Sequence, residues 1–136
     1  MRIKLGYGAY KPMRAHRTDA GLDLRSPVDA VVPARGSVCI DTAVCVELPK
    51  NTVGMVKSKS GLNVNNGIQC EGVIDVGYTG SIRVKLYNHS NTDYQVKRGD
   101  KIAQLVIMPI LIPDIVVVAE LEETERGANG FGSTGR

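Results

Sequence analysis

Ile82-Arg83-Val84-Lys85-Leu86-Tyr87 indicates the fold class, because apolar and polar residues alternate along the whole stretch. A period of two residues is typical of a half-buried β-strand, which has one face in the core and the other in water. The segment from Val44 to Leu48 alternates in the same way. The sequence therefore predicts strands that each cover one side of a core.

Shorter segments that are rich in branched residues predict further strands. They are Val31-Val32, Ser37 to Ile40, Val53 to Lys57 and Ile115 to Ala119. The run from Ile102 to Ile112 is nearly all apolar, so we expect that strand to be buried on both faces. Clusters of Pro, Gly, Asn and Asp punctuate the chain about every 8 to 12 residues, which favours an all-β sandwich, jelly roll or barrel. One short helix is expected, from Ser60 to Asn65.

Length and composition restrict the class of protein. A chain of 136 residues forms one domain by the usual prior. The 17 basic and 14 acidic residues are well mixed, and a net charge of +3 is too small for a nucleic-acid-binding stripe. No stretch approaches the ~18 apolar residues of a membrane span, and the N-terminus lacks the apolar core of a signal peptide. We therefore expect a soluble cytoplasmic protein (host cytoplasm if the source is a virus) with neither nucleic acid nor membrane as a partner.

The spacing of cysteine and histidine disfavours several kinds of active site. The three cysteines form no C-x-x-C pair, and His16 and His89 are not spaced to complete a zinc site. Neither histidine has a serine or cysteine partner in a recognisable nucleophile motif. Thiol, zinc and catalytic-triad mechanisms are therefore disfavoured, and buried free thiols in a reducing compartment are expected.

The segment from Gly72 to Gly80, Gly-Val-Ile-Asp-Val-Gly-Tyr-Thr-Gly, is typical of a strand followed by a turn. It places the carboxylate of Asp75 at the end of the strand and the ring of Tyr78 three residues later. Such a carboxylate can activate water, and the ring can serve as a platform for a sugar or base. The alternative is a β-hairpin in which Asp75 caps the turn and Tyr78 packs on the sheet. Taken alone, the alternative is the stronger interpretation because turn aspartates are common.

Three other blocks contain groups that bind anions or metals. The glycine-rich tail from Arg126 to Arg136 has backbone N–H groups, hydroxyls and arginines that suit a polyphosphate, while a disordered terminus is the alternative. Lys57 to Leu62 puts two ammonium groups and two hydroxyls at a strand-to-helix junction, which favours anions; its alternative is a serine N-cap with solvated lysines. Asp23 lies between two leucines, which is costly unless its carboxylate has a partner such as a hydrated metal, a basic group or a hydrogen-bonded turn.

These blocks, in this order, resemble the five motifs of the trimeric dUTP pyrophosphatase (dUTPase) family. The matching segments run from about Ala20 to the C-terminus: Ala20 to Ser26, Lys59 to Leu62, Gly72 to Gly80, Arg98 to Leu105, and Arg126 to Gly135. One motif would be weak evidence for the resemblance, but five motifs in order with compatible spacing are strong evidence. The resemblance implies hydrolysis of dUTP to dUMP and pyrophosphate, which supplies dUMP and keeps uracil out of DNA.

The resemblance also implies a role for each matching residue. Asp75 would be the base that orients and deprotonates the water attacking the α-phosphate, and Tyr78 would pack on the deoxyribose and exclude a 2′-hydroxyl. Asp23 would hold water bound to magnesium (Mg2+), the metal itself being chelated mainly by the three phosphates. The other substrate-binding residues are the uracil readers Gln69, Gly72, Val73 and Ile74, the phosphate ligands Lys59, Ser60, Gly61 and Gln104, and the tail residues Arg126, Phe131, Gly132, Ser133 and Thr134. In the tail, Phe131 would stack on uracil while the others close over the β- and γ-phosphates.

The family builds each active site from three chains of a jelly-roll homotrimer. The resemblance therefore implies a β domain over residues 1–120 and a flexible C-terminal arm over residues 121–136, which carries the fifth motif and extends to a neighbouring chain. Lys59 stands where the family usually has arginine, and lysine cannot make the same two-pronged contact with a phosphate. Two alternatives stay open: a dCTP deaminase of the same fold, and a non-catalytic trimeric β module that senses nucleotide or binds a protein.

Overall fold

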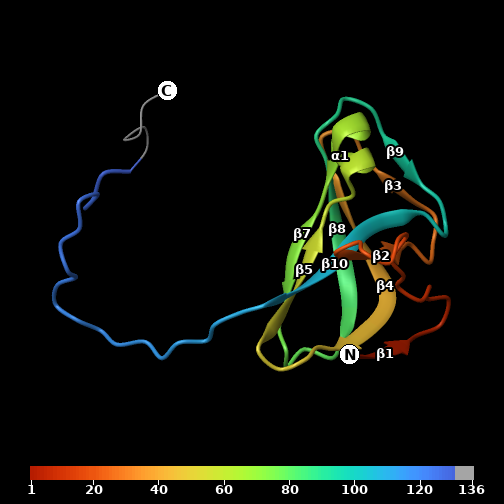
Figure 1. Ribbon diagram of the computed structural model, residues 1–136. Helices are drawn as coiled ribbons and strands as arrows, with labels where there is room; N and C mark the ends of the chain where they lie inside the picture. The colour runs from red at the N-terminus through yellow and green to blue at the C-terminus, as the bar shows by residue number, and fades with distance from the viewer. Residues whose placement is uncertain (131–136) are drawn as a thin grey trace.

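The computed structural model describes residues 1–130, which form antiparallel strands and one short helix (Figure 1). The strands are β1 (Arg2–Leu5), β2 (Gly21–Arg25), β3 (Ala30–Val32), β4 (Ser37–Glu47), β5 (Thr52–Lys57), β6 (Ile68–Gln69), β7 (Glu71–Ile74), β8 (Ser81–Asn88), β9 (Tyr94–Val96) and β10 (Lys101–Pro109). The helix α1 (Ser60–Asn66) lies between β5 and β6. The predicted all-β class is therefore confirmed.

Two four-stranded sheets make up the sandwich. One sheet has the strand order β1-β4-β8-β6 and the other β2-β10-β5-β7, while β3 and β9 form a separate two-stranded ribbon. Apolar side chains from both sheets and from the ribbon, such as Val84, Leu105 and Val32, belong to one buried cluster. A single core therefore holds the layers together, as expected for one domain of this length.

The alternation that predicts β8 is confirmed side chain by side chain. Ile82, Val84 and Leu86 are buried, whereas Arg83 and Lys85 are exposed. The predicted segments Ser37 to Ile40 and Val44 to Leu48 form one long strand, β4, which ends one residue earlier than predicted, at Glu47. The pairing of β4 with β8 shifts register between Asp41 and Cys45, and Ala43 has a positive φ of 54° there.

The segment from Gly72 to Gly80 is a corner between the two sheets. β7 pairs with β5 in one sheet, and β8 pairs with β4 and β6 in the other. The expectation of a two-stranded hairpin is therefore wrong, because local turn residues predict a reversal of the chain but not the sheet that each strand joins. The corner carries Asp75 and Tyr78 to the edge of the sandwich.

The predicted helix is confirmed with an end one residue later, at Asn66. Its N-cap is Lys59, and no side chain makes a capping hydrogen bond, so the serine N-cap is wrong. Gly67 ends the helix with a left-handed φ of 65°. Within residues 1–130, no helix has the length and apolar character that crossing a bilayer requires.

The three cysteines are free, as predicted, but they differ in burial. Cys70 is buried, and burial raises the pKa of its thiol. Cys45 is half-buried and Cys39 is exposed, so the expectation of buried thiols holds for Cys70 alone. Cys39 is exposed because it alternates with the buried Ile40 on the outward face of β4.

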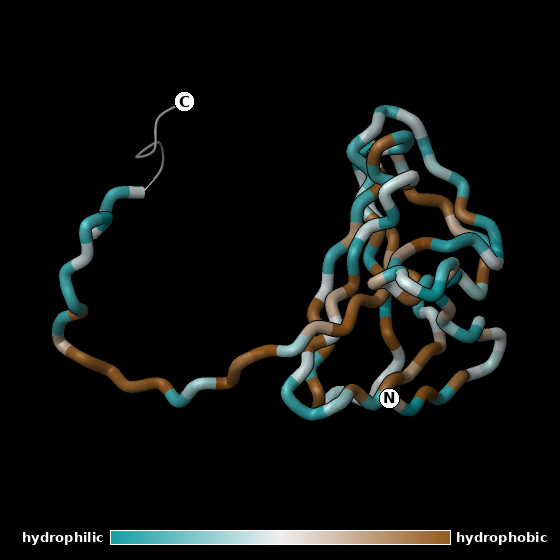
Figure 2. The backbone as a smooth tube through the Cα atoms, viewed as in Figure 1, coloured by the Kyte–Doolittle hydropathy of each residue, from teal (hydrophilic) through white to brown (hydrophobic). Residues whose placement is uncertain are grey.

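Beyond β10 the chain extends away from the sandwich (Figure 1). Residues 111–130 contain no helix or strand, so the strand expected from Ile115 to Ala119 is absent from the single chain. Figure 2 colours much of this stretch as hydrophobic, and Leu111, Ile115 and Val117 are each more than nine-tenths exposed. The run from Ile102 to Ile112 is predicted to be buried on both faces, but it is exposed from Met108 onwards, because no helix or strand within residues 1–130 covers it.

Candidate active site

Asp75 lies at the mouth of a small pocket on the corner between β7 and β8. The pocket has a volume of 230 Å³ and is lined by Val73, Ile74, Asp75, Tyr78, Ser81 and Arg83. Buried Ile74 anchors the end of β7, while Asp75 itself is exposed. The backbone N–H of Tyr78 donates to the carbonyl oxygen of Asp75 at 3.0 Å, which closes the turn. The Asp75 side chain is exposed, and its carboxylate has no hydrogen-bond partner among residues 1–130.

The ring of Tyr78 is held in place on the same corner. Its hydroxyl donates to the carbonyl oxygen of Ser81 at 2.9 Å. A Cβ at position 80 would lie 2.6 Å from that hydroxyl oxygen, so Gly80 provides the space in which the ring lies. The predicted carboxylate at the end of the strand and aromatic ring three residues later are therefore both on this corner, where the carboxylate is exposed and the ring is held by a hydrogen bond.

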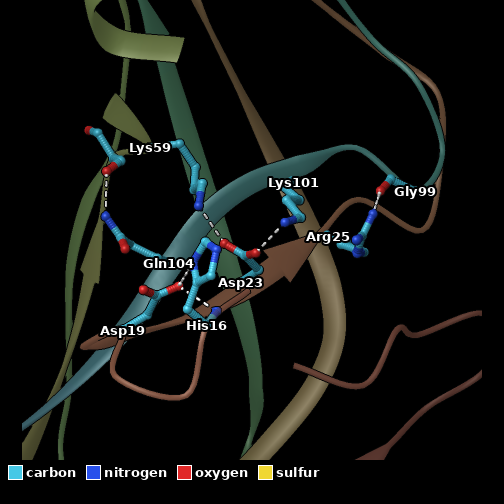
Figure 3. Close-up of polar contacts among 9 residues, drawn as sticks. His16, Asp19, Asp23, Arg25, Lys59, Gly99, Lys101 and Gln104 are labelled. Carbon is cyan, nitrogen blue, oxygen red and sulfur yellow. Dashed lines mark hydrogen bonds and ion pairs between the residues drawn. The ribbon is translucent and has the colours of Figure 1, made fainter. Parts of the chain in front are cut away.

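A second polar group surrounds Asp23 on β2 (Figure 3). Lys59 and Lys101 place their ammonium nitrogens 2.5 and 2.7 Å from the two carboxylate oxygens. The carboxylate is buried, with a side-chain exposure of 8%, whereas the two lysine side chains are 28% and 38% exposed. Burial by itself would raise the pKa of Asp23, but the hydrogen bonds from Lys101 and Lys59 outweigh it and hold the pKa below its ordinary value. Of the alternatives left open for Asp23, the basic partner is the one observed, and it is present twice.

Gln104 joins this second group from β10. It pairs directly with Asp23 across the β2–β10 ladder, and its Nε2 donates to the carbonyl oxygen of Ser58 at 3.0 Å (Figure 3). A Cβ at Gly21 would lie 2.9 Å from the Cβ of Gln104 and would overlap its amide oxygen. Gly21 is therefore needed for the observed position of Gln104.

The remaining predicted site residues are spread around these two groups. Ser60 and Gly61 form the exposed first turn of α1, next to Lys59. Gln69 ends β6, and its side-chain amide donates to Asn63 at 3.2 Å. Gly72 and Val73 lie on β7 beside Ile74, and exposed Arg126 donates to the carbonyl oxygen of Asn129 within the extended segment. Phe131, Gly132, Ser133 and Thr134 lie outside the described residues.

The two groups do not form one site within a single chain. On β5, Gly54 pairs with Ile74, next to Asp75, whereas Lys57 pairs with Gln104. The carboxylate–tyrosine pocket therefore lies beside the middle of β5, and the lysine group lies beside its end at Lys57. The pocket lining includes no residue of the lysine group.

Three residues of these groups are absent from the predicted site. Lys101 contacts Asp23, Gly21 makes room for Gln104, and Arg83 lines the pocket of Asp75. Lys101 and Gly21 lie inside the blocks that carry the family resemblance, so a residue-by-residue test of each block would have found them. Arg83 lies on the exposed face of β8, and the alternating pattern of that strand does not indicate that a carboxylate lies nearby.

Comparison with known proteins identifies the family. A model of the dUTPase family matches residues 9–135, which is nearly the whole chain. The chain belongs to the dUTPase family. Its relatives include the deoxyuridine 5′-triphosphate nucleotidohydrolase of Paramecium bursaria Chlorella virus 1, which is 45% identical over 133 residues that cover 97% of this chain and 94% of the relative. The protein of that name from Arabidopsis thaliana is 47% identical over 133 residues, which cover 97% and 80% of the two chains.

Solved dUTPase structures share the fold. The dUTPase of Staphylococcus bacteriophage 80alpha, solved with dUPNHPP, has a TM-score of 0.93 at 32% identity and is matched over 99% of this chain and 98% of its own. A variant of the dUTPase from phage phi11 of S. aureus, described with a structural Mg(II) ion, has a TM-score of 0.83 at 30% identity over 90% and 98% of the two chains. The predicted family and jelly-roll-like sandwich are therefore confirmed.

Proposed function

We propose that this chain hydrolyses dUTP to dUMP and pyrophosphate. The observation that carries the proposal is the exposed carboxylate of Asp75 beside the fixed ring of Tyr78, in a chain that matches the dUTPase family from residue 9 to residue 135. Relatives named deoxyuridine 5′-triphosphate nucleotidohydrolase, at 44–47% identity, support the same substrate. By this reaction the enzyme supplies dUMP and keeps uracil out of DNA.

In the proposed mechanism, Asp75 accepts a proton from a water molecule as the water oxygen attacks the α-phosphorus. The bond from that phosphorus to the α–β bridging oxygen breaks, and pyrophosphate leaves. An exposed carboxylate at the rim of a pocket can hold such a water, and a positioned general base contributes about 10²–10⁴-fold to a rate. Tyr78 packs on the deoxyribose, and its fixed ring leaves no space for a 2′-hydroxyl.

Uracil is read in this proposal by the backbone of Gln69 and of Gly72 to Ile74. β7 is the edge strand of its sheet, with β5 as its one neighbour, so backbone N–H and C=O groups on its outer side are available to a ligand. Such groups can match the donor and acceptor pattern of the uracil edge and exclude a 5-methyl or a 4-amino group. The pocket beside Val73 and Ile74 opens next to this edge.

The phosphates are held by the group around Asp23. Lys59 supplies charge, Gln104 and the first turn of α1 at Ser60 and Gly61 supply hydrogen-bond donors, and all of them lie close together in the fold. The arm would complete this site, with Phe131 stacking on uracil and Arg126, Gly132, Ser133 and Thr134 closing over the β- and γ-phosphates. A closed arm excludes water and strengthens each electrostatic contact.

Magnesium fits this site as an ion carried by the substrate. Residues 1–130 contain no group of three or more His, Cys, Asp or Glu side chains able to hold a metal directly. The Asp23 carboxylate has lone pairs beyond those that the two lysines occupy, so it can accept a hydrogen bond from metal-bound water. When bound, Mg2+ neutralises charge on the phosphates and on the leaving pyrophosphate.

We infer that the active enzyme is a homotrimer with shared sites. Within one chain the pocket of Asp75 is lined by no residue of the Asp23 group, which supports a site that a second copy completes. The exposed apolar segment from Leu111 to Val118 supports the same inference, because a stretch of this kind is stabilised by packing on another chain. Residues 121–136 then act as a flexible arm that brings the fifth motif to a neighbour's site. This assembly works in the cytoplasm, or in the host cytoplasm if the source is a virus.

A nucleotide screen tests the function. The full chain is incubated with Mg2+ and with dUTP, UTP, dTTP or dCTP, and both pyrophosphate and ammonia are measured. We expect pyrophosphate from dUTP alone and no ammonia. Ammonia released from dCTP would indicate a deaminase instead, and a folded assembly that releases no pyrophosphate from dUTP would indicate a non-catalytic binding module.

A further inference from the structure

Lys101 occupies a position that simple strand geometry does not give it. In an unbroken strand, residues three apart point to opposite faces, so Lys101 and Gln104 would diverge. The pairing of β10 with β2 shifts register between Lys101 and Ala103, and Ile102 and Ala103 are both buried. This irregularity brings Lys101 to the carboxylate of Asp23, which is also the residue directly opposite Gln104.

The two lysines are more than counter-ions for Asp23. One buried carboxylate neutralises one ammonium group, so the group of Asp23, Lys59 and Lys101 retains a net positive charge. An ammonium has three N–H donors, and each of these two contacts one oxygen of Asp23, so donors remain for an anion. The carboxylate is buried, whereas both lysine side chains are partly exposed, so an anion in solution can reach them.

We propose that Lys101 is a substrate-binding residue that acts together with Lys59 on the outer phosphates of dUTP. Asp23 holds the two ammonium groups side by side, one on each carboxylate oxygen. Two single-pronged contacts from two lysines then replace the two-pronged contact that one arginine makes. The proposal rests on dUTP being the substrate, and it adds a residue to the phosphate site of that reaction.

Equilibrium binding to the full-length protein tests the proposal. The probes are dUPNHPP, which has the outer phosphates, and dUMP, which lacks them. We expect Lys101→Ala and Lys101→Gln to weaken dUPNHPP binding at least tenfold and dUMP binding less than twofold. The glutamine variant keeps a hydrogen-bond donor for Asp23, so it separates loss of charge from loss of support, and thermal unfolding checks that both variants fold. Lys97→Ala is the matched control, because Lys97 lies 3.7 Å from Asp29 on the exposed turn before β10.

A second variant examines the sharing of roles between the two lysines. Lys59→Arg supplies a guanidinium group that can donate two hydrogen bonds to one phosphate. Adding it to Lys101→Ala should therefore recover most of the lost dUPNHPP affinity. Equal weakening of dUPNHPP and dUMP, or no weakening of either, would overturn the role of Lys101 and leave dUTP hydrolysis standing. If the wild-type protein bound neither nucleotide, the proposed function would fail, and the role of Lys101 with it.

Discussion

Tyr78 is fixed by three neighbouring features of one corner. Its hydroxyl donates to the carbonyl oxygen of Ser81, its ring lies over Gly80, and its own backbone N–H closes the turn on Asp75. A ring with so little freedom can reject a substrate by shape. In the proposed site, the group that it rejects is the 2′-hydroxyl of a ribonucleotide.

Tyr78→Ala should therefore relax the choice of sugar. We expect the kcat/KM for UTP relative to dUTP to rise at least tenfold, because the ring that excludes the 2′-hydroxyl is gone. Tyr78→Phe should keep the wild-type ratio, since it loses one exposed hydrogen bond worth about 1 kcal/mol and retains the ring. Steady-state rates on both nucleotides check this. Equal relaxation in both variants would show that the hydroxyl, and not the ring, selects the sugar.

Asp23 gives the fold a dependence on pH with a definite sign. Lys101 and Lys59 hold its pKa below the ordinary 3.8, so its contribution to stability is present above that pH and is lost as the pH falls through the folded-state value. We expect Asp23→Asn to lower the free energy of unfolding by about 2 kcal/mol at pH 7. The difference in free energy of unfolding between wild type and this variant should stay constant down to about pH 5 and shrink below pH 3.8. Urea unfolding at one protein concentration measures this difference. A difference that shrinks as the pH is raised from 5 would contradict the stabilising role of the ionised Asp23 carboxylate.

At the scale of residues, the sequence predicts what local chemistry determines. The apolar residues before Asp75 and the glycines around it predict a carboxylate at a turn after a strand, and the structure has one. The contact of Lys101 with Asp23 is not predictable in this way, because it depends on a register shift in β10. A period-two pattern assumes a regular ladder and carries no signal of a bulge.

Among the elements, β4 departs furthest from the predicted pattern. Two predicted strands form one, and Ala43 lies at the irregularity with a φ of 54°, where its backbone N–H donates to Asp41 at 2.8 Å. Alternation predicts the buried face on each side of this point, but it does not predict that the strand continues through it. The corner from β7 to β8 is unpredicted for a similar reason. Alternation of apolar and polar residues determines which face of a strand is buried, whereas long-range packing determines which sheet the strand joins.

Ala43→Gly should stabilise the protein. Alanine is strained at a positive φ and glycine is not, so we expect a gain of about 0.5–1 kcal/mol in the free energy of unfolding. Ala30→Gly, in the regular strand β3, is the matched control and should lose about the same amount. Denaturant unfolding of both variants measures the sign of each change in the free energy of unfolding. A loss at both positions would mean that the irregularity in β4 imposes no strain.

At the scale of the whole molecule, two features of the single chain support the proposed assembly. Its apolar segment from Leu111 to Val118 is exposed, and its two polar groups lie apart. The sequence predicts the apolar run, but composition does not reveal which chain covers it. Burial of that segment in a second copy would account for both features at once.

Two truncations separate assembly from catalysis. A chain that ends at Glu120 keeps the apolar segment and should still assemble, while losing about 10²–10³-fold in kcat/KM because the phosphate-binding tail is gone. A chain that ends at Pro109 should lose assembly as well. Light scattering gives the mass of each variant, and pyrophosphate release gives the rate. Full activity in the chain that ends at Glu120 would rule out a catalytic arm.

The most direct measurement is pyrophosphate release from dUTP and Mg2+ by Asp75→Asn, compared with wild type. The substituted amide keeps the shape of the side chain but cannot accept the proton from water, so the rate should fall by about 10²–10⁴-fold while dUPNHPP still binds. Asp93→Asn is the control, because Asp93 lies on the turn between β8 and β9, where it accepts a hydrogen bond from Ala34, and this variant should keep the wild-type rate. Turnover by Asp75→Asn at close to the wild-type rate would contradict the assignment of Asp75 as the general base.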